Sequence, residues 1–435
     1  MGKLTHFQLK LPNASSDTVR EAAAGQRERP SANRAKREKR QNDEDFGKFP
    51  AHVSIDTRRW RRVRDCKGAA LSGASPRFTV HILSTERSPS ARFSRYCAYL
   101  HHHSSQNDDE WIHTIERIVR QWKIDVVLPV TLGGVQLISQ RREAISKVSA
   151  IPPVPEYELI ELVRNKWSLY RFAEQRGLPV VPSLFIGKGG EPISASSDLD
   201  SVEYPALLKP TLQRGGFGIV KVDSPSDLQS AWKEKRIIRG DEYILQSYIP
   251  GVDVSFSVFC QCGEVMAYTL WRELLPSKEP FRVPRLVEYT NDERAVDVGK
   301  RLVSAIEWEG VADIELICDK RDQSVKILEV NPRFWQSLLG SLSAGVNFPL
   351  IACLSAVGEE CPDMRQTRYI RYARLSASVH MLPSWFVARG PAAGFSWRDS
   401  SIRFICNDPL PELVYALRRT ARSFRLAQIR SRLQR

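Results

Sequence analysis

The 435-residue sequence has no long hydrophobic run and no paired-cysteine motif. No apolar stretch approaches the roughly 18 residues that a membrane-spanning helix needs. The N-terminus, Met1–His6, lacks the apolar segment of a secretory signal. The eight cysteines are scattered and form no Cys-x-x-Cys pair, which argues against the common zinc and disulfide frameworks. We therefore expect a cytoplasmic protein with reduced thiols.

Two common nucleotide-binding signatures are also missing. No Gly-x-Gly-x-x-Gly follows the first predicted strand, and no Gly-Lys-Ser/Thr opens a helix. A dinucleotide fold of the usual kind and a Walker loop are therefore not supported. Three adjacent histidines, His101–His103, stand before a polar segment, and we predict a loop there without the fixed geometry of a metal site.

The positive charge of the chain gathers at its two ends. The formal net charge is +14, residues 27–40 are crowded with Lys and Arg, and the last 18 residues contain seven arginines. No zinc-finger spacing, basic zipper or ribonucleoprotein strand accompanies this charge, so we expect no specific nucleic-acid partner. Solvated ends are the favoured interpretation, and weak contact of a C-terminal basic helix with an anionic membrane is the alternative.

The central part of the sequence alternates strand and helix patterns. Short apolar runs at 51–55, 78–83 and 125–130 surround an amphipathic stretch at 111–122, which is typical of a parallel sheet with crossover helices. A helix is predicted from Tyr157 to Gly177, where glycine suits the C-terminal cap.

Further strands and helices mix between residues 204 and 358. A last strand is predicted over 368–382, and a basic helix follows it.

Three oxygen ligands and a guanidinium fall on two adjacent predicted strands. A polar turn separates Glu315 from Glu329, so a hairpin would bring the two carboxylates together. Asn331 lies two residues beyond Glu329 and shares its face, and Arg333 continues that face. Two carboxylates and an amide oxygen suit Mg²⁺. The guanidinium suits a carboxylate or phosphoryl group. A hairpin with merely solvated acids is the alternative.

A second pattern places a lysine before a glycine-rich turn. Lys209 ends a predicted strand, Gly215, Gly216 and Gly218 follow, and another strand resumes. Backbone N–H groups of such a turn can wrap a polyphosphate while the lysine supplies a point charge. A third segment, Gln246–Ile249 with Asp253 after it, can offer hydrogen-bonding groups to an adenine edge and to ribose hydroxyls.

In this order, the three patterns resemble the ATP-grasp superfamily of carboxylate–amine ligases over roughly residues 75–415. The resemblance is strongest to predicted carboligases related to the carbamoyl-phosphate synthase large subunit. It implies an α/β (α+β) fold, in which a Rossmann-like parallel-sheet domain precedes a two-lobed ATP-grasp domain with mixed and antiparallel sheets. The implied domains are a disordered basic arm (1–50), an N-terminal α/β domain (51–150), an ATP-grasp domain (151–360, with lobes at about 180–250 and 251–360) and a C-terminal extension with a basic helix (361–435).

The resemblance also implies roles for individual residues. The ATP-binding set would be Lys166, Lys209, Gly215, Gly216, Gly218, Gln246, Ser247, Tyr248, Ile249 and Asp253. The metal ligands would be Glu315, Glu329 and Asn331, holding Mg²⁺ with Mn²⁺ as an alternative. Arg333 and Arg272 would stabilise the transferred phosphoryl group.

The implied function is an ATP- and Mg-dependent ligase that activates a carboxylate as an acyl phosphate for attack by an amine or another nucleophile. A catalytically silent ATP-binding scaffold, docking on a membrane or polyanion through its basic termini, is the alternative. The sequence names neither small-molecule substrate, and it leaves the oligomeric state open, a homo-oligomer included.

Two regions depart from the family pattern or stay ambiguous. Residues 276–285 are basic and contain proline where related proteins often have glycine, and this puts the substrate-side loop in doubt. Near the end, Leu413, Leu417, Ala421 and Phe424 recur at helical spacing. We favour a helix packed on the core there over an interfacial helix on anionic lipid.

Overall fold

The computed structural model describes the backbone of residues 52–56 and residues 78–105, 107–189, 199, 202–233, 237–277, 281, 284–361, 366–373, 397–418, 420 and 421. The chain divides into two units, 1–45 and 46–435, and the fold below is that of the second. The arm predicted over residues 1–50 lies outside the described residues. None of the helices in the described part has the length and apolar character required to cross a bilayer.

The first sheet contains four strands in the order β3-β2-β1-β4. The strands are β1 (His52–Asp56), β2 (Thr79–Ser84), β3 (Cys97–His102) and β4 (Val126–Pro129). The β2 and β3 strands are parallel, as predicted. The β1 strand lies between β2 and β4 and pairs antiparallel with both, so β2 and β4 share a direction and the sheet as a whole is mixed.

Three helices accompany this sheet: α2 (Asp108–Trp122), α3 (Leu132–Gln140) and α4 (Arg142–Ser146). The apolar face of α2 is buried, and the Asn107 side chain caps its first turn by accepting from Asp109 N. The predicted loop at the histidine run is wrong at two of its three positions. His101 and His102 end β3 because they pair with Leu83 and Ser84 of β2.

The helix predicted from Tyr157 to Gly177 is two helices, α5 (Tyr157–Arg164) and α6 (Lys166–Gln175). Asn165 between them is extended, and its side chain accepts from Trp167 N and Ser168 N. A single helix is therefore the wrong prediction, because Asn165 acts as an N-cap and restarts the helix. Lys166 thus stands at the first position of α6. Gly177 does end this region, with a φ of 64°.

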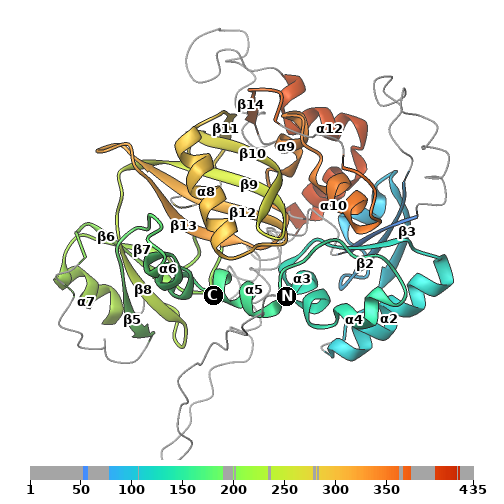
Figure 1. The fold of residues 1–435 in the computed structure, drawn as a ribbon, viewed down its shortest axis with the longest axis horizontal. Coiled ribbons are helices and arrows are strands. Elements are labelled where there is room, and N and C mark those ends of the chain that lie inside the picture. Colours follow the sequence, from blue (N-terminus) through green and yellow to red (C-terminus); the bar gives the residue numbers. More distant parts are fainter. Residues whose placement is uncertain are drawn as a thin grey trace, which may run out of the picture. The chain divides into compact units, whose positions relative to one another are not determined.

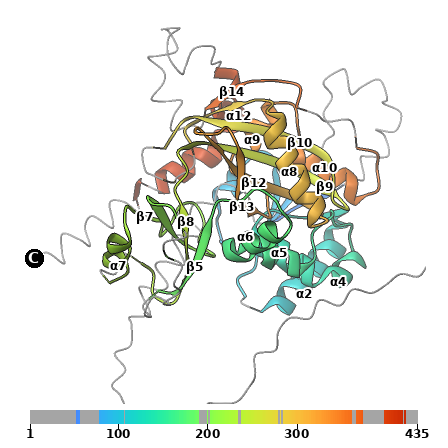
Figure 2. The same cartoon turned by 60° about the vertical axis from the view of Figure 1, so that its left-hand side comes forward.

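A second, antiparallel sheet follows in the order β5-β8-β6-β7. Its strands are β5 (Ser183–Lys188), β6 (Ala206–Pro210), β7 (Val220–Val222) and β8 (Glu242–Ser247). The α7 helix (Pro225–Lys233) lies against this sheet (Figure 2). Apolar side chains from the helix and the sheet, including Leu208, Leu228 and Leu245, form one core beneath it.

The largest sheet has six strands in the order β13-β12-β9-β10-β11-β14, all pairing antiparallel. They are β9 (Gly251–Gln261), β10 (Glu264–Leu275), β11 (Leu286–Tyr289), β12 (Gly310–Asp319), β13 (Val325–Asn331) and β14 (Arg371–Ala373). The α8 helix (Glu293–Ala305) crosses one face (Figure 1). Val254, Phe256 and Val258 of β9 join the core on that side, so the odd-numbered residues of β9 face away from α8.

The remaining described elements are the short helices α9 (Leu338–Ser343), α10 (Phe348–Ala356) and α12 (Ser401–Asn407), and a helical segment at 410–418. The strand predicted over 368–382 is realised as β14, and residues 374–382 lie outside the described residues. The predicted domain limits near residues 150 and 360 stay predictions.

The predicted packing of the C-terminal helix on the core is wrong for its leucines. Leu413 is 55% exposed and Leu417 is 60% exposed. The reason is that polar groups hold this helix to the protein. The Arg418 guanidinium donates to the oxygens of Ser88, so the apolar side is left facing outward.

Candidate functional site

Two carboxylates face each other on the side of the large sheet opposite α8. Glu315 of β12 pairs directly with Glu329 of β13, as the predicted hairpin requires. The same cross-strand row continues through Ser255 of β9 to Trp271 of β10. Directly paired residues share a face, so these four side chains belong to one surface. We call this surface the carboxylate face.

Asn331 links the two carboxylates to Arg333. Its amide nitrogen donates to Glu315 Oε1 at 3.1 Å and to Glu329 Oε1 at 3.4 Å. Its amide oxygen accepts from Arg333 Nη2 at 3.0 Å, and Arg333 Nη1 donates to the Phe334 carbonyl at 2.8 Å. The structure therefore brings all four residues of the predicted metal and phosphoryl set together.

A third buried acid, Asp313, lies on the same face two residues before Glu315. Its Oδ1 accepts from the hydroxyls of Ser255 at 2.5 Å and Ser257 at 2.7 Å. Burial raises the pKa of Asp313 despite these hydrogen bonds. Our sequence reasoning did not assign this residue, although the period of two places it on the face of Glu315. Three acids at one place give the site an excess of negative charge.

Lys166 connects the carboxylate face to the segment that follows Lys209. Its Nζ lies 2.8 Å from Glu329 Oε2 and donates to the Gln213 carbonyl at 2.8 Å. Its backbone N–H donates to the Thr211 carbonyl at 3.0 Å. The N-cap at Asn165 fixes where this lysine starts α6, so a local helix signal positions a side chain of the site.

The charges around Glu329 and Glu315 shift their pKa values in opposite directions. Burial alone would raise the pKa of Glu329, but the charge and hydrogen bond of Lys166 hold it below its usual value. Burial and the neighbouring Glu329 carboxylate raise the pKa of Glu315 well above its usual value. One lysine therefore balances one of the two facing acids, and the second lacks an equal counter-charge.

Lys209 is a buried lysine that bonds a glutamine on the neighbouring strand. Its Nζ donates to Gln246 Oε1 at 2.7 Å, and Gln246 Nε2 donates to Ser183 Oγ at 2.9 Å. Burial, followed by the nearby charge of Lys166, lowers the pKa of Lys209 to about 8. A buried lysine with a second lysine nearby forms a site that favours an added anion.

The glycine-rich turn meets the connection between β10 and β11. Gly215, Gly216 and Gly218 all have positive φ, between 61° and 75°. A Cβ added to Gly216 would lie 2.0 Å from the Phe281 carbonyl oxygen. The turn therefore needs glycine twice over, for its backbone conformation and for this close approach.

Arg214, which precedes these glycines, is a further residue that our sequence reasoning did not assign. Burial, with the charge of Arg214 as the next cause, lowers the pKa of Arg333 to about 10. The two guanidinium groups are thus close enough to interact, and an anion between them would relieve their repulsion. The adjacent glycine signal was the only sequence feature that pointed to this position.

The predicted adenine-binding segment is divided between the two faces of its sheet. Gln246 lies on the face of Lys209, because Lys209 pairs with Ile244 and alternate residues share a face. Ser247 lies on the other face with the α7 core, and its N–H donates to the Pro182 carbonyl. The role predicted for this residue rests on backbone groups of the segment, and it stays a prediction.

Tyr248 and Ile249 follow at the end of this strand. The Tyr248 N–H donates to the Pro205 carbonyl at 2.9 Å, so this donor is already engaged. The Ile249 side chain is buried, and the Tyr248 ring is partly exposed with Lys221 Nζ 5.3 Å from its centre. Their predicted roles in adenine binding stay predictions.

Asp253 lies on the carboxylate face, two residues before Ser255 on β9. Glu273 of β10 lies on the same face, two residues beyond Trp271. Burial and the Asp253 carboxylate raise the pKa of Glu273 to about 7. The predicted ribose contact of Asp253 is thus placed on the correct side of the sheet, beside a second carboxyl group that our sequence analysis did not assign.

Arg272 lies on the opposite face from Arg333. It pairs with Val254, a residue of the α8 core, and its guanidinium bonds Glu288 at 2.6 Å. Its neighbour Trp271 is the β10 residue in the row of Glu315. The role predicted for Arg272 at the phosphoryl group is therefore at odds with the structure, because strand alternation turns this side chain away.

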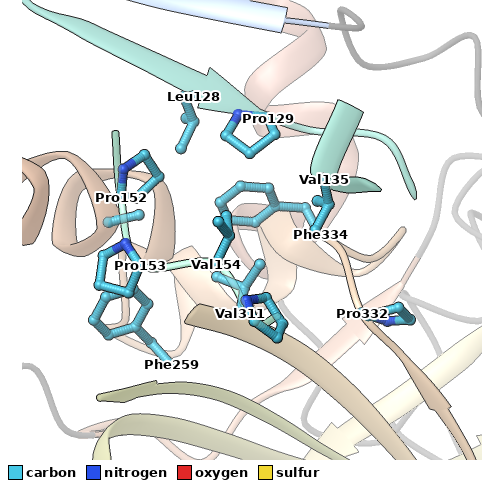
Figure 3. Close-up of a pocket in the computed structure, with 12 residues that line it drawn as sticks. Leu128, Pro129, Val135, Pro152, Pro153, Val154, Phe259, Val311, Pro332 and Phe334 are labelled. Carbon is cyan, nitrogen blue, oxygen red and sulfur yellow. The ribbon is translucent and has the colours of Figure 1, made fainter. Parts of the chain in front are cut away.

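An apolar pocket lies next to Arg333 in the chain. Figure 3 shows it with the Phe334 ring among Leu128, Val135 and Val154. Pro332 also lines it, so both neighbours of Arg333 are packed against residues of the N-terminal part of the described chain. This packing holds the backbone on both sides of Arg333 in place.

The donor set fits a hard divalent cation. Within the described ranges no group of three His, Cys, Asp or Glu side chains is arranged as a metal site, and the candidate set consists of two carboxylates and one amide. Two facing buried carboxylates favour a cation between them, and oxygen ligands suit Mg²⁺. The Asn331 amide would have to turn its oxygen toward the carboxylates to join the ligands.

Comparison with known proteins identifies the domain that carries this site. Residues 163–337 match the family model described as an ATP-grasp domain. The match includes both lysines, the glycine-rich turn, both glutamates, Asn331 and Arg333. The chain therefore contains an ATP-grasp domain, and the predicted resemblance is confirmed.

Curated relatives are similar to part of this chain. The arginine-specific large chain of carbamoyl phosphate synthase from Geobacillus stearothermophilus is 22% identical over 250 residues, which are 54% of this chain and 23% of that protein. The D-aspartate ligase of Enterococcus faecium (strain Aus0004) is 25% identical over 233 residues, 49% of this chain and 54% of that protein. The chain thus spans about a quarter of the first relative and about half of the second.

A solved structure shows the same fold. The biotin carboxylase domain dimer of 2-oxoglutarate carboxylase from Hydrogenobacter thermophilus, in complex with MgADP, ADP and bicarbonate, has a TM-score of 0.53 and 19% identity. The match covers 72% of this chain and 71% of that chain. The predicted α/β fold with mixed and antiparallel sheets is confirmed.

Proposed function

We propose that this protein is an ATP- and Mg²⁺-dependent ligase that activates a carboxylate as an acyl phosphate and transfers it to an amine or another nucleophile. The observation that carries the proposal is the 2.8 Å contact between Lys166 Nζ and Glu329 Oε2. It joins the cationic groups that suit a polyphosphate to the carboxylates that suit its metal ion. The name of the D-aspartate ligase among the similar proteins supports the same class of reaction.

In this proposal the triphosphate of ATP lies between the glycine-rich turn and the two lysines. Burial and the charge of Lys166 lower the pKa of Lys209, and a bound polyphosphate would favour the charged form of Lys209. Asp253 and Gln246 lie on the faces that border this space, and they are the groups we assign to the ribose and to the base. Positive φ at the three glycines lets backbone N–H groups point toward phosphate oxygens.

Glu315, Glu329 and Asn331 would hold Mg²⁺, with Mn²⁺ as a substitute. The ion supplies neutralisation of the phosphate charge when bound. The Asn331 oxygen has one role at a time: facing Arg333, as in this structure, or facing the carboxylates. Turning it toward the carboxylates would end its hydrogen bond with Arg333 Nη2, which we propose then bonds a phosphoryl oxygen. Metal binding and the release of Arg333 are therefore coupled in our proposal.

The reaction has two steps. A carboxylate oxygen of the substrate attacks the γ-phosphorus of ATP, the bond to the β,γ-bridging oxygen breaks, and ADP leaves with an acyl phosphate formed. An amine nitrogen then attacks the acyl carbon, the bond from that carbon to the phosphate oxygen breaks, and inorganic phosphate leaves as the nitrogen loses a proton. Arg333 and Arg214 stabilise the charge on the phosphoryl group, and positioning replaces any covalent enzyme intermediate.

The test uses two glutamates with matched surroundings. Glu329 and Glu288 are both 19% exposed, both pair with a cation, and they belong to opposite faces of the same sheet. ADP release by the full chain is measured with ATP, Mg²⁺ and pools of carboxylates and amines. We expect substrate-stimulated release that Glu329→Gln lowers by about 100-fold or more and Glu288→Gln leaves within about twofold.

The result that contradicts the proposal is nucleotide binding without substrate-stimulated ADP release across both pools. That outcome favours the scaffold alternative. Equal loss of turnover in both variants would also oppose the assigned site, because it would show that the face of the sheet does not matter.

A further inference from the structure

The helix at residues 410–418 presents an uncharged, leucine-rich side to solvent. Leu410 is 53% exposed, Leu413 is 55% exposed and Leu417 is 60% exposed. Spacings of three and four residues place them on one side of the helix. The exposed residues of the described segment 410–421 are listed here: Leu410, Leu413, Ala416, Leu417, Thr420 and Ala421. We call the three leucines the C-terminal leucine face.

The opposite side of this helix is fixed to the protein by polar contacts. Arg418 donates to the backbone and side-chain oxygens of Ser88. Just before the helix, Asp408 accepts from the Ser94 hydroxyl at 2.5 Å and from Arg95 N at 3.2 Å. These contacts hold the helix in place with its three leucines outward.

The positive charge of the sequence near this helix indicates which kind of surface the leucine face would bind. Seven arginines stand among the last 18 residues, and the chain has a net charge of +14. Two copies meeting through this face would bring two arginine-rich segments together, which like-charge repulsion opposes. The phosphates of a nucleic acid would attract the arginines, but a nucleic acid has no apolar layer in which the three leucines could be buried. An anionic lipid surface offers both negative head groups and an apolar layer.

We propose that the C-terminal leucine face binds the surface of an anionic lipid bilayer, with the leucines inserted below the head groups and the positive charge of the arginine-rich end of the sequence adding electrostatic attraction. The face lies outside residues 163–337 and uses none of the residues assigned to the ligase reaction. The proposal therefore stands or falls separately from the proposed enzymatic function.

The test is flotation of the full chain with two kinds of vesicles, phosphatidylcholine alone and an equal mixture of phosphatidylglycerol and phosphatidylcholine. The variant is the double substitution Leu413→Gln and Leu417→Gln, which alters exposed side chains and spares the Arg418 contacts. The control is the double substitution Met266→Gln and Leu342→Gln, which changes side chains that are 46% and 41% exposed elsewhere. Far-ultraviolet circular dichroism establishes that all three proteins are folded.

We expect the wild type and the control to float with the anionic vesicles and not with the neutral ones. The leucine variant should bind at least about tenfold more weakly, since each leucine loses an apolar insertion. Equal binding by the leucine variant would overturn the proposal, because it would show that the protein binds the vesicles through its positive charge alone. Absence of flotation with anionic vesicles would overturn it as well. So would a wild-type dimer, measured by light scattering, that the leucine variant converts to monomer, because the occupant would then be a second copy.

Discussion

Lys166 and Glu329 form an ion pair, with 2.8 Å between Nζ and Oε2, across elements that are more than 150 residues apart in the chain. The lysine side chain is 11% exposed and the glutamate side chain 19%. The pair is therefore shielded from solvent, and its loss should matter more than the loss of a surface pair.

Replacing Lys166 by methionine should destabilise the protein in the absence of nucleotide. Glu329 would then face Glu315 without its ion-pair partner, and we expect the free energy of unfolding to fall by about 2–3 kcal/mol at pH 7. Urea denaturation measures this. Adding Glu329→Gln to the variant should recover part of the loss, because the two substitutions share one interaction.

The control for this prediction is Arg164→Met, which breaks a more exposed pair with Glu161. Its cost should stay below about 1 kcal/mol. Equal losses of unfolding free energy in the Lys166 and Arg164 variants would show that the shielded pair contributes no more to stability than the exposed one.

The lowered pKa of Lys209 predicts that the free energy of unfolding rises with pH. Its pKa of about 8 in the folded protein lies below the ordinary lysine value of 10.5, so the unfolded chain binds more protons between these values. The free energy of unfolding should therefore increase as the pH rises from about 8 to about 10.5. Lys209→Met should remove this rise and stabilise the protein at pH 7 by about 2 kcal/mol, while weakening ATP binding.

Urea denaturation at several pH values checks the prediction. The control, Lys221→Met, changes a lysine that is 47% exposed on the neighbouring strand, and it should keep the rise. Parallel pH profiles for the wild type and Lys209→Met would contradict the assignment.

Gly216→Ala should impair turnover more than stability explains. Gly216 and Gly177 have similar positive φ values, 72° and 64°, so the backbone conformation by itself should cost alanine about 1 kcal/mol of unfolding free energy at either position. Only at Gly216 does the new Cβ meet the Phe281 carbonyl; nothing lies within 4 Å at Gly177. We expect kcat for ADP release to fall at least about tenfold in Gly216→Ala and to be unchanged in Gly177→Ala. Equal kcat values in the two variants would speak against a role for the close approach.

Two arginines distinguish the faces of the large sheet. Arg333→Lys should lower the single-turnover rate of ADP formation by about 100-fold, because a lysine cannot reproduce the fork that bonds the Phe334 carbonyl and that we propose to bond a phosphoryl oxygen. Arg272→Lys should leave the rate within about twofold, since its partner Glu288 lies on the α8 side. A large loss in Arg272→Lys would reverse this assignment.

The sequence was sufficient to predict the hairpin that holds Glu315 and Glu329. Alternating apolar residues around a polar turn specify both strands, and the acids interrupt the pattern at positions of one face. The positions of β2, α2 and β4 were predicted for the same reason. These features depend on residues close together in the chain.

The residues placed wrongly depend on longer-range information. Arg272 directly follows Trp271, which lies on the carboxylate face, but which residues of a strand face which side is fixed only by its pairing with another strand. The break at Asn165 followed from a capping side chain within an otherwise helical pattern. The outward leucines of the C-terminal helix follow from contacts of Arg418 and Asp408 with residues more than 300 positions earlier, which periodicity alone does not reveal.

The turn between β12 and β13 is anchored by Asp319, which is 1% exposed on its side chain and accepts from Arg321 N at 2.9 Å and Lys326 Nζ at 3.4 Å. The carboxylates opposite each other are several residues away from this turn. A shift of one residue in the pairing of β13 with β12 would turn the Glu329 side chain toward α8. The amino-acid sequence of the site would be unchanged. The length of this surface turn therefore determines whether Glu315 and Glu329 face each other. Insertion of a single residue in the turn should abolish the proposed metal site as completely as the loss of a carboxylate.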